Sequence, residues 1–212
     1  MRIKFCGITR LADAELAIAL GAWAIGMVFW KRSPRALAPA AGAEIAAAVK
    51  RRVEIAGVFV NPTLDEVAGV AEGAGLTLIQ LHGQEGPVFC GEVARRTGCK
   101  VIKVARVRSR AEIQALASFH TDFHLLDSHV ADVPGGTGET FAWEMARARP
   151  SSVPLILSGG LTPGNVAQAI GVVAPFAVDV ASGVESAPGI KDPEKLRRFA
   201  ETVAEQFALT AP

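Results

Sequence analysis

Residues 154–183 have the sequence PLILSGGLTPGNVAQAIGVVAPFAVDVASG. Two short apolar runs, Pro154–Leu157 and Ala177–Ala181, enclose a longer stretch that Thr162-Pro163 opens. Threonine is a favoured N-cap and proline a favoured first helical residue, so this stretch predicts a helix that starts there. Parallel neighbouring strands need such a crossover, and the segment therefore predicts a βαβ unit.

The same alternation runs along the whole chain of 212 residues. Helical patterns such as Leu11–Leu20 and Ala40–Val49 lie between the apolar runs, and Thr63–Glu66 and Ser109–Glu112 fit capping boxes. Asp192-Pro193 marks a further helix start. The predicted strands are Ile3–Ile8, Ala24–Phe29, Glu54–Val60, Leu76–His82, Val101–Ala105, Phe123–Asp127, Pro154–Leu157 and Ala177–Ala181.

Eight βα units favour a (β/α)8 TIM barrel over a doubly wound sheet, which typically has about five or six strands. Barrels of roughly 200–250 residues are routinely one domain, so we expect residues 1–212 to form a single catalytic domain.

The composition excludes several classes of partner. With 22 basic and 21 acidic residues the net charge is +1, which gives no reason to expect nucleic acid or an anionic membrane. No apolar run approaches the roughly 18 residues of a membrane span, and no signal peptide is apparent. The three cysteines fit neither a disulfide framework nor a zinc site, so we expect a cytoplasmic protein. We expect a monomer by default, because no sequence feature identifies a subunit interface.

Polar residues interrupt the apolar runs at their C-terminal ends, which converge on the active face of a barrel. They are Cys6, Gln80, His82, Lys103, Asp127, Asp179 and Ser182. The pattern predicts a functional site, although some of these side chains could simply cap the layers of the barrel.

Glycines follow the last two predicted strands, as Gly159-Gly160 after Ser158 and Gly183 after Ser182. Glycine lets backbone N–H groups approach phosphate oxygens closely, and these two loops often bind phosphate in barrel enzymes. We therefore expect a small phosphorylated ligand.

Two loops add to this prediction. Residues 128–140, after the sixth strand, form a long connection that can close over a substrate; a surface insertion is the alternative. Arg35, in the turn Ser33-Pro34-Arg35, could bind a carboxylate through two charge-assisted contacts or could be solvated.

With these motifs together the chain resembles the phosphoribosylanthranilate isomerase family over residues 3 to about 200. The motifs that carry the resemblance are KFCGIT (4–9), GMVFWKRSPR (26–35), GVFVN (57–61), IQLHG (79–83), LD (126–127), GGTG (135–138), FAW (141–143), SGGL (158–161), NV (165–166), DVASGVE (179–185) and PGIKD (188–192).

The resemblance implies an Amadori rearrangement of N-(5-phosphoribosyl)anthranilate in tryptophan biosynthesis, without a metal or organic cofactor. It implies that Asp127 is the general acid and Cys6 the general base, with Lys4 as a possible helper. It also implies that Arg35 holds the anthranilate carboxylate. The phosphate would bind at Gly159, Gly160, Ser182 and Gly183, and Asp179 would orient the substrate.

Two alternatives remain at this point. One is a related aminoaldose-phosphate isomerase of histidine biosynthesis, which has the same fold. Resemblance to that family would imply a pair of aspartates as acid and base, whereas here the first predicted strand carries Cys6. A non-catalytic phosphosugar-binding barrel would be expected to lack Cys6 or Asp127, and both are present.

Overall fold

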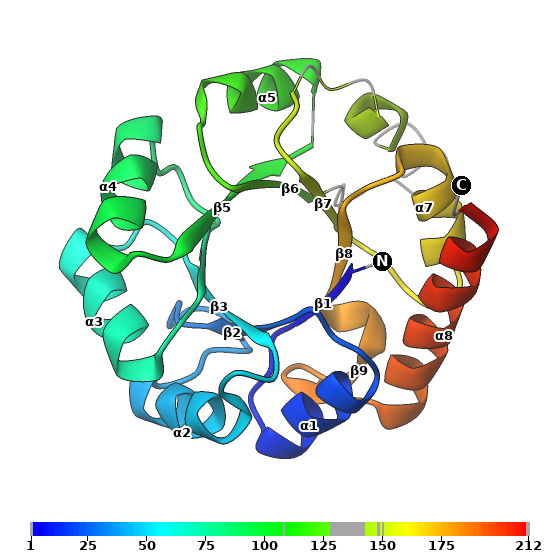
Figure 1. Cartoon of the computed structure of the whole chain (residues 1–212), viewed down its shortest axis with the longest axis horizontal. Helices are drawn as coiled ribbons and strands as arrows, with labels where there is room; N and C mark the ends of the chain where they lie inside the picture. Colours follow the sequence, from blue (N-terminus) through cyan, green and yellow to red (C-terminus); the bar gives the residue numbers. More distant parts are fainter. Residues whose placement is uncertain (1, 108, 128–142, 148, 150, 211–212) are drawn as a thin grey trace.

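The computed structural model describes residues 2–107, 109–127, 143–147, 149 and 151–210. Eight parallel strands form a closed barrel in the order β1 to β8, and helices surround it (Figure 1). This confirms the predicted (β/α)8 fold. The strands are β1 (Arg2–Cys6), β2 (Ala24–Val28), β3 (Glu54–Phe59), β4 (Leu78–Leu81), β5 (Lys100–Arg106), β6 (Phe123–Asp127), β7 (Leu155–Ser158) and β8 (Ala177–Val180).

Helices follow the strands along the described parts of the chain, and residues 143–147, between β6 and β7, are also helical. The described helices include α1 (Leu11–Ala19), α2 (Pro39–Val49), α3 (Leu64–Ala74), α4 (Pro87–Thr97), α5 (Arg110–Ala115), η1 (Leu116–Ser118), α7 (Val166–Val173), η2 (Ser182–Val184) and α8 (Pro193–Thr210). After η2 the antiparallel pair β9 (Glu185–Ala187) and β10 (Ile190–Lys191) leads into α8. None of the described helices has the length and apolar character that a membrane span requires.

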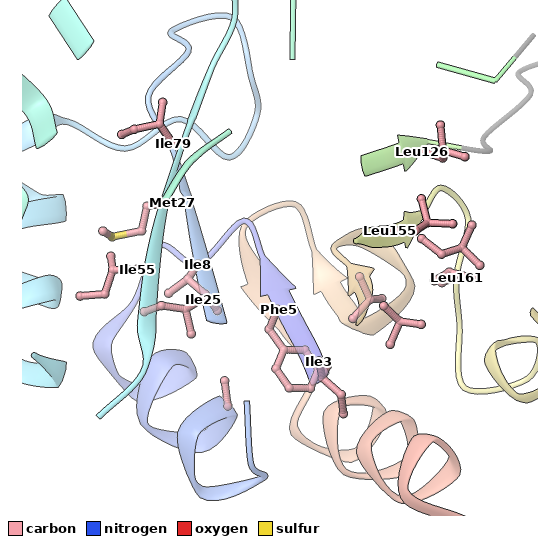
Figure 2. Packing of buried hydrophobic residues seen from close by; sticks show 14 of the residues in the cluster. Ile3, Phe5, Ile8, Ile25, Met27, Ile55, Ile79, Leu126, Leu155 and Leu161 are labelled. Carbon is pink, nitrogen blue, oxygen red and sulfur yellow. The ribbon is translucent and has the colours of Figure 1, made fainter. Parts of the chain in front are cut away.

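Alternating strand residues build two apolar layers, because successive side chains point to opposite faces of a strand. The inward layer fills the N-terminal half of the barrel with residues such as Leu78, Ile102 and Phe123. The outward layer packs against the helices, as Figure 2 shows for Ile3 and Phe5 beside the last helix. The ring of Phe5 lies 6.1 Å from that of Phe199 in α8.

Local sequence accounts for most helix starts. Capping boxes are present at Thr63–Glu66 and Ser109–Glu112, and α8 begins at Pro193 with Asp192 accepting two backbone N–H groups, as predicted. The helix start predicted at Thr162-Pro163 is wrong, because α7 begins at Val166. The Asn165 side chain accepts from the Thr162 N–H at 2.8 Å and closes a turn first.

Register places later site residues side by side. The pairing of β1 with β8, which closes the barrel, sets Lys4 opposite Asp179. The pairing of β6 with β7 sets Asp127 opposite Ser158. Chemistry-bearing residues from distant parts of the chain therefore meet at the same end of the barrel.

Candidate active site

A cavity of about 350 Å³ opens at the C-terminal ends of the strands. Its lining comes from all eight strands or the loops that follow them, so closure of the barrel brings these groups together. Of the residues predicted from the sequence, the lining includes Cys6, Arg35, Gln80, His82, Asp127, Gly159, Gly160, Asp179 and Ser182. Gly183 is not part of this lining, and its place is described below.

The centre of the site is a buried ion pair between β1 and β8. The Lys4 Nζ donates to Asp179 Oδ1 at 2.8 Å, and the Ser158 hydroxyl donates to Asp179 Oδ2 at 3.0 Å. Burial lowers the pKa of Lys4, but Asp179 and Cys6 raise it more, so the pKa lies above its ordinary value. The lysine is therefore an ammonium at neutral pH.

The Cys6 thiol lies beside that ammonium, with Gly26 of β2 underneath it. A Cβ at residue 26 would come within 2.8 Å of the Cys6 Sγ and 3.1 Å of the Lys4 Nζ, so glycine makes room for both groups. Burial raises the pKa of the thiol and Asp179 raises it further, while Lys4 and Lys191 lower it. The effect of burial is the largest, so the pKa of Cys6 lies above its ordinary value. The resting group is therefore a thiol, and its thiolate is a comparatively strong base once formed.

Asp127 ends β6 and faces a chain of polar groups from β4. The His82 Nε2 lies 3.5 Å from Asp127 Oδ2, and the Gln80 amide lies 3.4 Å from the other ring nitrogen of His82. The side chains of His82 and Asp127 are each about one quarter exposed, at 23%. The loop 128–140, predicted to close over the substrate, lies outside the described residues.

Arg35 reaches the cavity from the loop after β2, but it is already engaged with a carboxylate. Its Nε donates to Glu185 Oε1 at 2.8 Å and its Nη2 to Glu185 Oε2 at 2.6 Å. The guanidinium is thus held as a planar fork at the cavity wall, a geometry suited to carboxylate recognition.

The two glycine loops form one surface at the ends of β7 and β8. Gly159 and Gly160 have φ angles of 91° and 64°, which favour glycine because side chains are strained there. Gly183 lies in η2, where a Cβ would overlap the carbonyl group of Leu161. This close approach keeps the two loops in contact, and the role of Gly183 in phosphate binding stays a prediction.

Several residues of the site carried no individual prediction. Trp30, Ser33, Arg106 and Leu161 line the cavity, and Arg106 brings a further exposed cation to the end of β5. Glu185 and Lys191 lie behind it and were part of the quoted motifs without a role of their own. Within the described ranges, no group of three or more histidine, cysteine, aspartate or glutamate residues could hold a metal ion.

Comparison with known proteins assigns this arrangement to one family. The family model described as N-(5'phosphoribosyl)anthranilate (PRA) isomerase matches residues 3–202. A relative from Citrifermentans bemidjiense, named N-(5'-phosphoribosyl)anthranilate isomerase, is 48% identical over 198 residues, which are 93% of this chain and 94% of the relative.

Solved structures agree with this. The phosphoribosyl anthranilate isomerase of Thermotoga maritima is 39% identical with a TM-score of 0.86, covering 97% of this chain and 99% of that one. A second such structure, 37% identical with a TM-score of 0.83 and the same coverage, is a complex with reduced 1-(o-carboxyphenylamino)-1-deoxyribulose 5-phosphate.

Proposed function

The chain belongs to the N-(5'-phosphoribosyl)anthranilate isomerase family, and we propose that its cavity carries out that isomerisation with Cys6 as the general base and Asp127 as the general acid. The observation that carries the proposal is the cavity that brings Cys6, Arg35, Asp127 and the two glycine loops together. The reaction belongs to tryptophan biosynthesis and converts an aminoaldose phosphate into an aminoketose phosphate.

The chemistry needs one acid and one base. Protonation of the ribose ring oxygen opens the ring and forms a Schiff base with the anthranilate nitrogen. Removal of the C2 proton then gives an enolamine, which becomes the ketone when its hydroxyl loses a proton and its carbon C1 gains one. The nitrogen of the substrate accepts the electron pair, so side chains need only move protons.

Asp127 suits the acid because it is only partly exposed and lies at the end of β6, facing the cavity. Cys6 suits the base because the neighbouring Lys4 ammonium favours the thiolate against the cost of burial. Asp179, held by Lys4 and Ser158, would steady the developing positive charge of the Schiff base.

The two ends of the substrate would bind to different groups of the cavity. Arg35, preoriented by Glu185, would take the anthranilate carboxylate. The backbone around Gly159, Gly160, Ser182 and Gly183 would hold the phosphate, with the close packing of Gly183 against Leu161 keeping these loops together.

We further propose that the chain acts as a single catalytic domain and a cytoplasmic monomer on its phosphorylated substrate. The cavity is lined from all eight strands of the one barrel, which supports a single catalytic domain, and all three cysteines are free thiols, as is usual in the cytoplasm.

The test is a fluorescence time course with freshly generated phosphoribosylanthranilate, whose anthranilate signal falls on conversion. The Cys6→Ser variant should lose kcat by on the order of 100- to 10,000-fold, because a hydroxyl is a far weaker acid than a thiol. Cys99→Ser is the matched control, since Cys99 lies away from the cavity with its Sγ against the Leu76 carbonyl. A Cys6→Ser enzyme with more than half the wild-type kcat would refute the assignment.

A further inference from the structure

Lys191 is a fully buried lysine of β10, with 1% of its surface exposed. Its Nζ donates to the Cys6 carbonyl at 2.6 Å, to the Ala181 carbonyl at 3.0 Å and to Glu185 Oε1 at 3.0 Å. An ammonium has three protons to donate, so these three acceptors use its whole capacity.

One of the two carbonyl groups, that of Cys6, ends the first strand of the barrel, and the other, that of Ala181, directly follows the last. The parallel pairing of β1 with β8 ends at Phe5 and Val180, and the next residue of each strand is Cys6 and Ala181. Beyond this point the two chains enter separate loops. Lys191 therefore joins the ends of β1 and β8 where the pairing stops, beside the thiol.

The position of Lys191 is itself fixed from two sides. Its backbone N–H donates to Asp13 Oδ2 of α1 at 3.2 Å, and Asp13 is also bound by Arg10. Glu185 in turn accepts from Arg35 and from the Gly189 N–H, so the same carboxylate orients both cations. A single network therefore connects Cys6 with Arg35.

The charged groups that face Cys6 come from four elements. They are Lys4 of its own strand, Asp179 of β8, Lys191 of β10 and Arg35 of the loop after β2. The opposite charges of Lys4 and Asp179 largely cancel each other. The single negative charge of Glu185 is shared between two cations, Arg35 and Lys191. Arg35, Lys191 and Glu185 together therefore place a net positive charge on that side of the Cys6 thiol.

We propose that Lys191 is a positioning residue for the reaction, which clamps the backbone of Cys6 to the end of β8 and supplies positive potential that favours the Cys6 thiolate. This inference rests on the proposed role of Cys6 as the base. Lys191 touches the backbone and the carboxylate of Glu185, so it acts through Cys6 and not on the substrate.

The experiment measures alkylation of Cys6 by iodoacetamide against pH, with the adduct on each cysteine quantified by peptide mass spectrometry. Lys191→Met removes both the charge and the hydrogen bonds, whereas Lys191→Gln removes the charge and retains an N–H donor. Both variants should raise the midpoint for Cys6 by on the order of one pH unit, since a nearby opposite charge shifts a pKa by about that much. The alkylation rate and kcat at pH 7 should each fall roughly tenfold, with KM less affected.

Lys195→Met is the matched control. Its Nζ also donates to a backbone carbonyl of this region, that of Glu185 at 2.8 Å, but Lys195 does not contact Cys6. The pH midpoint of Cys6 alkylation in Lys195→Met should equal that of the wild type.

A purely structural lysine would give a different result. Lower thermal stability with an unchanged Cys6 midpoint in Lys191→Gln would overturn the proposal, and so would equal shifts in Lys191→Gln and Lys195→Met. Failure of the underlying assignment has a separate signature, because Cys6→Ser would then keep its turnover whatever the Lys191 variants do.

Discussion

Replacing Lys4 with methionine should destabilise the protein by about 3–5 kcal/mol, the usual cost of removing one partner of a buried ion pair. The Lys4 side chain is 0% exposed and that of Asp179 is 6% exposed, with their charged atoms 2.8 Å apart. Methionine has a similar length, so packing changes little. The Asp179 carboxylate would retain the Ser158 hydroxyl, a neutral donor, but would lose its cation.

The expected loss is large against a total stability of roughly 5–15 kcal/mol. Burial lowers the pKa of Lys4, but Asp179 and Cys6 raise it further, so the folded pKa exceeds the ordinary 10.5. The contribution of the pair is therefore fully present at neutral pH and is lost only as the pH rises through the folded pKa.

Urea unfolding followed by tryptophan fluorescence and far-UV circular dichroism measures the effect. The midpoint should fall by more than about 1 M, given a slope of about 3 kcal/mol/M. Lys50→Met, at an exposed lysine, should leave the midpoint unchanged. The double variant Lys4→Met/Asp179→Asn should recover at least about 2 kcal/mol, because it removes the stranded charge. A wild-type midpoint for Lys4→Met, or simple additivity in the double variant, would refute the reasoning.

Four further outcomes are expected. Asp127→Asn should abolish most of kcat in the fluorescence assay, because an amide cannot act as the acid; a change in KM alone would make Asp127 a binding residue. Arg35→Met should raise the inhibition constant of a product analogue that carries the carboxylate by roughly 10- to 100-fold, about 1.5–3 kcal/mol, and leave that of an analogue without the carboxylate unchanged. Arg52→Met, at an exposed ion pair, should change neither inhibition constant. Since the pKa of Cys6 is raised, kcat should still increase with pH above neutrality, and a plateau below pH 7 would contradict this. Burial raises the pKa of Glu185, but Arg35 and Lys191 lower it more, so the folded pKa lies below the ordinary 4.5. The stabilising contribution of Glu185 is therefore present above pH 4.5 and is lost as the pH falls through the folded pKa. Glu185→Gln should reduce the loss of unfolding free energy in this acid range.

The strand pattern could be predicted because it is local. Each of the eight apolar runs overlaps one strand of the barrel, and the errors lie at the ends. The run Ile3–Ile8 overshoots β1, since Gly7 adopts a φ of 76° and turns the chain after Cys6. Apolar character continues through Ile8, so hydropathy alone could not show where the strand ends.

The partners of the site residues could not be predicted, because they are not local. Glu185 is 150 positions from Arg35, and Lys191 is 185 positions from the Cys6 carbonyl that it binds. A buried lysine that donates to backbone carbonyls leaves no sequence pattern, since every residue has such a carbonyl. Family resemblance could draw attention to the two motifs that contain Glu185 and Lys191, but only the three-dimensional structure shows their contacts.

Two lysines form the same kind of clamp at different places around the cavity. Lys191 binds the carbonyl groups of Cys6 and Ala181 at the ends of β1 and β8, while Glu185 accepts the Gly189 N–H. Lys103, 4% exposed, donates to the Gly83 carbonyl at 2.9 Å and to Glu85 at 2.7 Å. Glu85 in turn accepts the N–H groups of Gly83 and of Asn61 in the loop after β3.

Because buried ion pairs are rarely net stabilising, stability alone does not explain such clamps. The apolar N-terminal half of the barrel can supply that stability through residues such as Leu78 and Phe123. What the clamps add is fixed loop geometry at strand ends, where parallel pairing can no longer hold the backbone. An active site that moves protons between groups on different strands requires that precision.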